Sequence, residues 1–154
     1  MPLDPIFSCS MLTNMVKIAD ASKSLQKSHK IVVPFPDPKP DQNAAYKVTY
    51  RRPSKINVVG SYALKTMIKS DDALSVDMVV TMPASIFEEK DFLNYRYFYK
   101  RAYYLACIAA GLQGTSPEEF TLKFENLNGN SLHPILVVRL KSSASLTPLQ
   151  AWLN

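Results

Sequence analysis

The predicted fold depends on two stretches, Val58-Val59-Gly60-Ser61 and Val76-Asp77-Met78-Val79. Each lies in a short apolar run, residues 56–59 and 74–82, with the length and composition of a β-strand. Residues 62–70 between them predict a short helix. Strand, helix and strand in this order indicate an α+β domain with α/β-like connections, in which helices pack on a mixed β-sheet.

These stretches resemble the active-site frame of nucleotidyltransferases of the polymerase β superfamily. In that superfamily a strand ends in Gly-Ser, whose backbone approaches a triphosphate, and the next strand presents two acids two residues apart. Side chains two apart on a strand share a face, so both carboxylates jointly hold the divalent cations of phosphoryl transfer. Gly60, Ser61 and Asp77 occupy those places here, but Val79 replaces the second acid.

The third carboxylate of that superfamily, normally on a later strand, is missing too. The candidate strand is residues 134–140, and no acid occurs between Asn126 and Asn154. We therefore expect a degenerate nucleotidyltransferase-like domain that is not an enzyme, holds no metal and needs no cofactor. Its vestigial site has no catalytic residue and consists of Gly60, Ser61, Asp77 and Val79.

Other interpretations of these residues stay open. A glycine after a strand often serves only a tight turn. Asp77 has the alternative role of an acid held by backbone donors or by a nearby lysine. Asp71 and Asp72 are a second source of metal ligands, although aspartates in the loop before a strand more often cap a turn.

The remaining elements follow from periodicity and turn chemistry. Apolar residues at helical spacing predict an amphipathic helix over residues 10–27. Residues 34–40 contain four prolines, which exclude a helix or a central strand and predict an extended connector. Further strands are predicted over residues 46–50, 120–125 and 134–140, the last two joined by a turn at Asn128-Gly129.

The longest predicted helix spans residues 92–112 and ends near Gly111 and Gly114. Residues spaced three and four apart form a stripe that we expect to be buried. They are Tyr95, Phe98, Ala102, Leu105, Ala109 and Leu112.

The first half of this helix mixes basic and aromatic residues as an RNA-binding surface does. Arg96, Lys100 and Arg101 are the candidates for RNA contact. The alternative is that the tyrosines pack in the core with their hydroxyls at its rim and that the arginines pair with Glu88, Glu89 or Asp91.

Length and composition fit one domain of 154 residues with 47% hydrophobic residues. The net charge of +5 permits contact with nucleic acid without requiring it. Cys9 and Cys107 lack neighbours at metal-ligand spacing, so we expect reduced thiols in a soluble intracellular domain, without a membrane span or a signal segment. His29 and His133 likewise have no partners in a recognisable catalytic arrangement.

Three segments are expected: an N-terminal helix and Pro-rich connector over 1–45, a nucleotidyltransferase-like core over 46–142, and a segment leading out of the domain over 143–154. Leu149, Trp152 and Leu153 in the last segment would then belong to something that continues, so we expect the chain to be a fragment of a longer multidomain protein.

Several blocks of sequence occur together in the order found in a known family. They are Val58-Val59-Gly60-Ser61-Tyr62, Val76-Asp77, Leu93-Asn94, Arg96-Tyr97-Phe98 and Lys100-Arg101-Ala102, with Thr81-Met82-Pro83 and Lys90-Asp91 in support. In these blocks the chain resembles the first domain of the Nrap family, the nucleolar RNA-associated proteins of ribosome assembly. The resemblance is dense from Ile56 to Leu112 and weak before Tyr46.

This resemblance implies a nucleolar, non-catalytic scaffold of the small-subunit processome, which acts in pre-18S rRNA processing. Its expected partners are other processome proteins, the remaining domains of the longer protein and pre-ribosomal RNA, with no membrane. The alternative is an active metal-dependent RNA nucleotidyltransferase whose missing carboxylates come from residues outside this chain. A third hypothesis is a protein-interaction domain without RNA contact.

Overall fold

The structure is a computed structural model that describes residues 15–68 and 75–141. Two helices dominate it, α1 (Ile18–His29) and α3 (Arg96–Thr115). The described strands form three separate two-stranded antiparallel sheets, so the fold is α+β as predicted. The prediction of one mixed sheet is wrong for this part of the chain.

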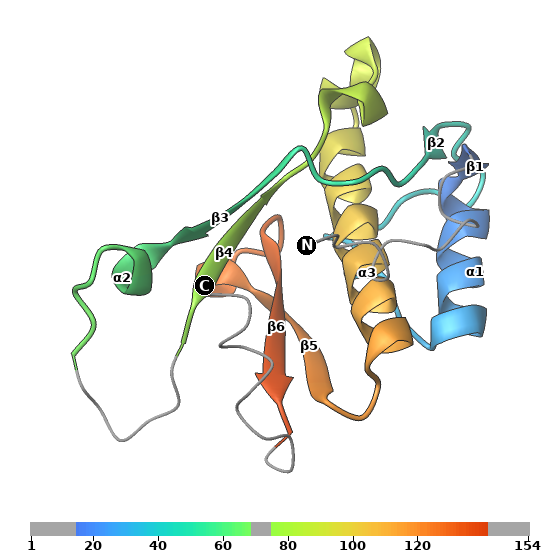
Figure 1. Cartoon of the computed structure of the whole chain (residues 1–154). Coiled ribbons are helices and arrows are strands. Elements are labelled where there is room, and N and C mark those ends of the chain that lie inside the picture. The colour runs from blue at the N-terminus through green and yellow to red at the C-terminus, as the bar shows by residue number, and fades with distance from the viewer. Residues whose placement is uncertain (1–14, 69–74, 142–154) are drawn as a thin grey trace.

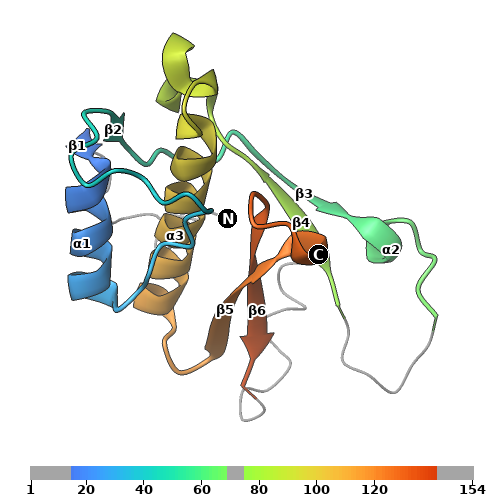
Figure 2. The same ribbon diagram turned by 180° about the vertical axis from the view of Figure 1, so that it is seen from behind.

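Helix α3 lies in the middle of the molecule, with α1 on one side and the hairpin of β5 (Phe120–Asn126) and β6 (Pro134–Leu140) on the other (Figures 1 and 2). Small side chains on α3, among them Ala102 and Ala106, are fully buried and let α1 approach closely. Ile18 and Leu25 of α1 fill this contact at 0% and 1% exposure. The segment before residue 46 therefore contributes to the same core as the rest.

The predicted stripe on α3 is wrong in phase. Tyr95 is 46% exposed, and Phe98, Leu105 and Leu112 are only partly buried, whereas Ala102 and Ala109 are in the core. The side chains buried instead follow a broader face, because α3 is covered on two sides. They are Tyr99, Lys100, Ala102, Tyr103, Tyr104, Ala106, Cys107, Ala109 and Ala110.

Two tyrosines of α3 hold the irregular segments that connect the other elements. The Tyr99 hydroxyl donates to the Pro38 carbonyl at 2.7 Å, and the Tyr104 hydroxyl donates to the Arg51 carbonyl at 2.9 Å. Burial raises the pKa of both phenols, that of Tyr104 to about 12, so both stay protonated and able to donate at neutral pH. As predicted, residues 34–40 form neither helix nor strand.

Helix α1 begins later than predicted, because Val16 and Lys17 form strand β1 and pair with β2 (Lys47–Val48). Residues 10–14 of the predicted helix lie outside the described residues. The helix ends in a left-handed residue, Lys30, whose N–H donates to the Gln26 carbonyl at 3.1 Å. Strand β2 is shorter than the predicted 46–50.

The hairpin of β5 and β6 confirms the predicted strands and their turn, with Phe120 opposite Leu140 and Asn126 opposite Pro134. Asn128 and Gly129 both have positive φ, 52° and 74°, which is the conformation that favours these residue types. Helix α3 continues through Gly111 and Gly114 to Thr115, so its predicted end was too early. Among the described residues, no helix combines the length and the hydropathy that a membrane span requires.

Candidate functional site

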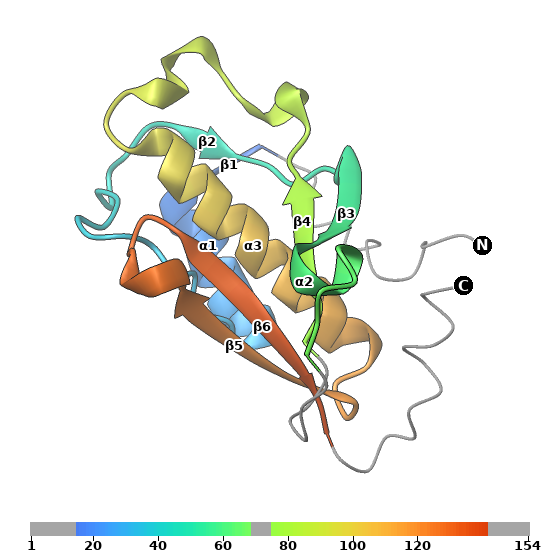
Figure 3. The same cartoon turned by 90° about the vertical axis from the view of Figure 1, so that its left-hand side faces the viewer.

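The predicted frame is formed by β3 (Lys55–Val59), α2 (Gly60–Ala63) and β4 (Asp77–Thr81). The two strands are neighbours, as predicted, and run antiparallel with Val59 opposite Asp77 and Asn57 opposite Val79. Figure 3 shows β3 and β4 side by side, with α2 at the end of β3. The helix predicted over 62–70 is a single turn that begins at Gly60 and ends by Leu64.

Gly60 and Asp77 are brought into direct contact by this register. Gly60 has a φ of +73°, and a Cβ atom built on it would lie 2.5 Å from Oδ2 of Asp77. Only glycine combines that backbone conformation with so close an approach. The Asp77 carboxylate therefore lies against the backbone at the strand-to-helix junction.

The other two residues of the predicted site lie at this frame without adding a ligand. Ser61 is exposed, and its carbonyl accepts a hydrogen bond from the Thr66 N–H at 3.0 Å, which closes the turn after α2. Val79 is 49% exposed and lies two residues from Asp77 on the same strand, hence on the same face. An apolar side chain thus occupies the position where a second carboxylate would point.

In the described part of the chain no group of three or more His, Cys, Asp or Glu residues is placed to hold a metal ion, so Asp77 is not part of such a group there. Strands β5 and β6 form their own sheet, and Glu125 on β5 pairs with Lys123 at 2.9 Å. Asp71 and Asp72 lie outside the described residues. What the described site offers a divalent cation is one exposed carboxylate, and phosphoryl-transfer sites use more than one.

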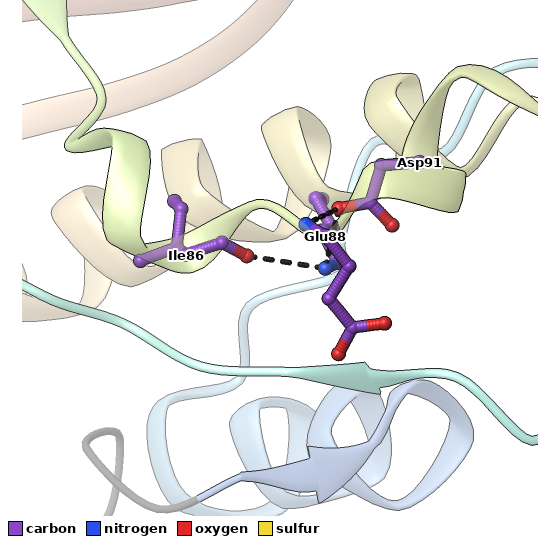
Figure 4. A network of polar contacts seen from close by, with 4 residues as sticks. Ile86, Glu88 and Asp91 are labelled. Atoms are coloured by element: carbon purple, nitrogen blue, oxygen red, sulfur yellow. Dashed lines mark hydrogen bonds and ion pairs between the residues drawn. The ribbon is translucent and has the colours of Figure 1, made fainter.

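Lys100, one of the three candidates for RNA contact, is buried at 4% exposure. Its Nζ lies 2.6 Å from Oδ2 of Asp91 and donates to the Ile86 carbonyl at 3.1 Å. The same Asp91 oxygen accepts the Glu88 N–H at 2.8 Å. Figure 4 shows Ile86, Glu88 and Asp91 gathered in this network. The Lys100 charge is thus used inside the protein and is not presented to a phosphate.

The other two candidates, Arg96 and Arg101, also contact groups of the protein itself. The Arg96 guanidinium lies over the Tyr46 ring, 5.3 Å from its centroid. Arg101 donates to the Leu132 carbonyl and lies 6.0 Å from the centroid of the Phe98 ring. Tyr99, Tyr103 and Tyr104 are buried, as in the alternative given above, but Asp91 is paired with Lys100 and not with an arginine.

The exposed apolar face of the β3–β4 pair was not predicted. Residues directly opposite in an antiparallel pair share a face, which places Ile56 and Val80 beside Val58 and Met78. Ile56, Val58 and Met78 are 44%, 39% and 63% exposed. The signal was present in the sequence, because every residue of this face is apolar, whereas the opposite face of the pair carries Lys55, Asn57, Asp77 and Thr81. Val80 at one end of the apolar face packs against the core, which leaves the other three residues exposed.

Comparison with known proteins gives a family and several relatives. Residues 15–151 match the family described as Nrap protein domain 1. The chain is 48% identical over 84 residues to the U3 small nucleolar RNA-associated protein 22 of Saccharomyces cerevisiae, covering 54% of this chain and 7% of that protein. It is 33% identical over 118 residues to the Schizosaccharomyces pombe protein of the same name, covering 77% and 11%. Human nucleolar protein 6 is 45% identical over 87 residues, covering 56% and 7%. The chain thus spans about a tenth of the length of these relatives.

The buried ion pair of α3 leads to a stability prediction. Asp91→Ala leaves the Lys100 ammonium buried without its counter-charge, which is expected to cost about 3–5 kcal/mol of unfolding free energy. Lys100→Met added to Asp91→Ala removes that charge and should recover part of the loss. Urea denaturation of the two variants measures both effects.

Lys90→Ala is the control, because Lys90 is exposed and adjacent in sequence to Asp91. Its effect should stay within about 0.5 kcal/mol. If Asp91→Ala were as mild as Lys90→Ala, the pair would not be the buried interaction that the structure shows.

Proposed function

This chain belongs to the Nrap family as a match to its first domain, and we propose that it is a non-catalytic assembly module of nucleolar ribosome biogenesis. The names of its relatives, nucleolar protein 6 and U3 small nucleolar RNA-associated protein 22, support the nucleolar setting. The proposed role is that of a nucleotidyltransferase-like domain in a longer protein, which joins other small-subunit processome proteins and pre-ribosomal RNA.

The observation that carries the non-catalytic part is the contact between Gly60 and Asp77. It fits the proposed nucleotidyltransferase-like frame, in which a valine at position 79 takes the place of the second acid. Phosphoryl transfer depends on positioning and on neutralising charge with metal ions, and a single exposed carboxylate is a weak holder of such ions. The frame therefore supports a structural role better than a catalytic one.

The exposed apolar face of Ile56, Val58 and Met78 supports the assembly part of the proposal. Contiguous apolar surface rimmed by polar residues usually marks a protein interface. Because the chain covers 7% to 11% of its relatives' length, we assign this face to another part of the same longer polypeptide. In this proposal the apolar face packs against a neighbouring domain of the same chain.

The catalytic part is tested by incorporation of labelled nucleotide into RNA with Mg²⁺ or Mn²⁺, run on this chain and on the longer protein that contains it. We expect no turnover above background from either, because the ligands for the metal ions are missing. Asp77→Ala should change stability or partner binding rather than a rate.

Turnover by the longer protein that disappears in Asp77→Ala would establish the alternative, an active RNA nucleotidyltransferase completed by carboxylates outside this chain. Turnover that Asp77→Ala leaves unchanged would place an activity in another domain and leave the role proposed for this one intact.

The interface is tested by thiol labelling of Met78→Cys, read out by mass spectrometry of the labelled peptide. The new thiol should react in the 154-residue chain and be protected at least tenfold in the longer protein, because the apolar face is covered there. Leu127→Cys, exposed at the β5–β6 turn, should react in both. The native Cys107 is buried and reports that the fold is intact.

Equal reactivity of Met78→Cys in the two proteins would contradict the assignment of this face to the longer polypeptide. Protection in the 154-residue chain that increases with its concentration would show instead that two copies of the chain cover the face.

A further inference from the structure

The net charge of the chain is concentrated in one part of the sequence. Residues 15–52 contain eight Lys and Arg residues and three Asp residues, an excess of five that equals the net charge of the whole protein, +5. In the structure these residues form β1, α1, β2 and the segments around them. The remaining residues sum to a charge close to zero. The basic residues of α3 are among them, and their side chains already contact other groups of the protein.

Helix α1 presents lysines on the side opposite to the core. Successive residues turn by roughly 100° around a helix axis, so Lys23 and Lys27 lie opposite the buried residues Ile18 and Leu25. Lys23 and Lys27 are both exposed, and they are four residues apart, a spacing at which like charges repel. Among the described residues neither lysine forms an ion pair, although Asp20 lies on the same side of the helix, three residues before Lys23.

Two more lysines meet at the start of the same helix. Lys17 on β1 lies directly opposite Lys47 on β2, and both are exposed. The neighbouring pair, Val16 and Val48, has Val48 buried at 2% exposure, so the lysines occupy the solvent face of this short ribbon. Like charges directly opposite each other destabilise a strand pair. Neither lysine has an acidic partner among the described residues, and a bound anion would remove the repulsion.

The two lysine pairs lie on adjoining elements, with Lys17 just before the first turn of α1 and Lys27 in its last turn. β1 runs directly into α1, and β2 packs beside the first turn of the helix (Figures 1 and 2). We call Lys17, Lys23, Lys27 and Lys47 the lysine surface. It lies across α3 from the β3–β4 pair, so a ligand bound to it leaves both the apolar face and the vestigial frame free.

The chemistry of the surface indicates what it binds. The exposed positions of α1 carry lysine, serine, glutamine and aspartate, and none carries a large apolar side chain that would form the centre of a protein interface. Four flexible ammonium groups without an aromatic platform suit a backbone of repeated phosphates read without regard to sequence. We propose that the lysine surface is a binding site for the sugar-phosphate backbone of RNA. The choice of RNA among polyanions rests on the proposed function, and the location of the site rests on the placement of the charges alone.

The test compares two fourfold variants of equal charge. One replaces the lysine surface, Lys17→Gln, Lys23→Gln, Lys27→Gln and Lys47→Gln. The control replaces four exposed lysines outside residues 15–52, Lys55→Gln, Lys65→Gln, Lys90→Gln and Lys141→Gln. Affinity for a fluorescent single-stranded RNA is measured by anisotropy between 50 and 200 mM salt. Each phosphate contact adds about 0.7 to the slope of log affinity against log salt, so four contacts give about a 50-fold loss over this range.

We expect the lysine-surface variant to flatten that slope by about three and the control to flatten it by less than one. Thermal unfolding without RNA checks that both variants fold, and relief of repulsion between Lys17 and Lys47 should leave the first at least as stable as the parent chain. Lys23→Gln with Lys27→Gln is the smaller variant, which leaves the strand pair intact and should remove about half of the slope.

Equal slopes for the two fourfold variants would overturn the proposal, as would an affinity of the parent chain that does not depend on salt. Tighter binding of polyglutamate than of RNA at the same salt would also overturn it, in favour of an acidic protein ligand. Failure of the proposed function is seen separately, as nucleotide transfer that depends on Asp77, and such transfer would leave the RNA measurement unaffected.

Discussion

The packing of α3 between α1 and the β5–β6 hairpin is the constraint on which the rest of the structure depends. Alanines at positions 102 and 106 permit it, since larger side chains would keep α1 away. Once α3 is enclosed, its long polar side chains need partners inside the protein. Tyr104 then fixes the carbonyl of Arg51, shortly before β3, and so helps to set where the vestigial frame begins.

This arrangement separates three surfaces that sequence alone does not distinguish. Gly60 and Asp77 are in contact at the strand-to-helix junction, while the neighbouring face of Val58 and Met78 offers exposed apolar area. Residues 15–52, which include α1, carry an excess of positive charge equal to the net charge of the whole chain. These features are the basis of the proposed assembly role, because binding needs complementary surface whereas phosphoryl transfer needs several metal ligands at one point.

Local signals predicted those parts of the fold that local chemistry determines. Strands β3 and β4 follow from their apolar runs, and β5, β6 and the Asn128-Gly129 turn follow from alternation and from residues that accept positive φ. That β3 and β4 are neighbours follows from the order of elements, whereas the contact of Gly60 with Asp77 depends on their register. Tertiary context determined the rest. Val16 and Lys17 pair with β2 instead of extending α1, and α3 is buried on two sides, which no single stripe describes. From the sequence, Lys100 was a candidate for RNA contact. Its ion pair with Asp91 is a tertiary contact, because it depends on how residues 84–92 fold back onto the helix.

The most direct test of the central claim, that this frame no longer assembles a metal site, is a Mn²⁺ titration followed by NMR in the presence of a nucleoside triphosphate. Paramagnetic broadening of the Gly60 and Asp77 amide signals reports a bound ion. Val79→Asp serves as the positive control, since it restores a second carboxylate on the same strand face. We predict no saturable broadening in the parent chain and saturable broadening in Val79→Asp. Saturable broadening at Gly60 and Asp77 in the parent chain, at the Mn²⁺ concentrations that saturate Val79→Asp, would contradict the account.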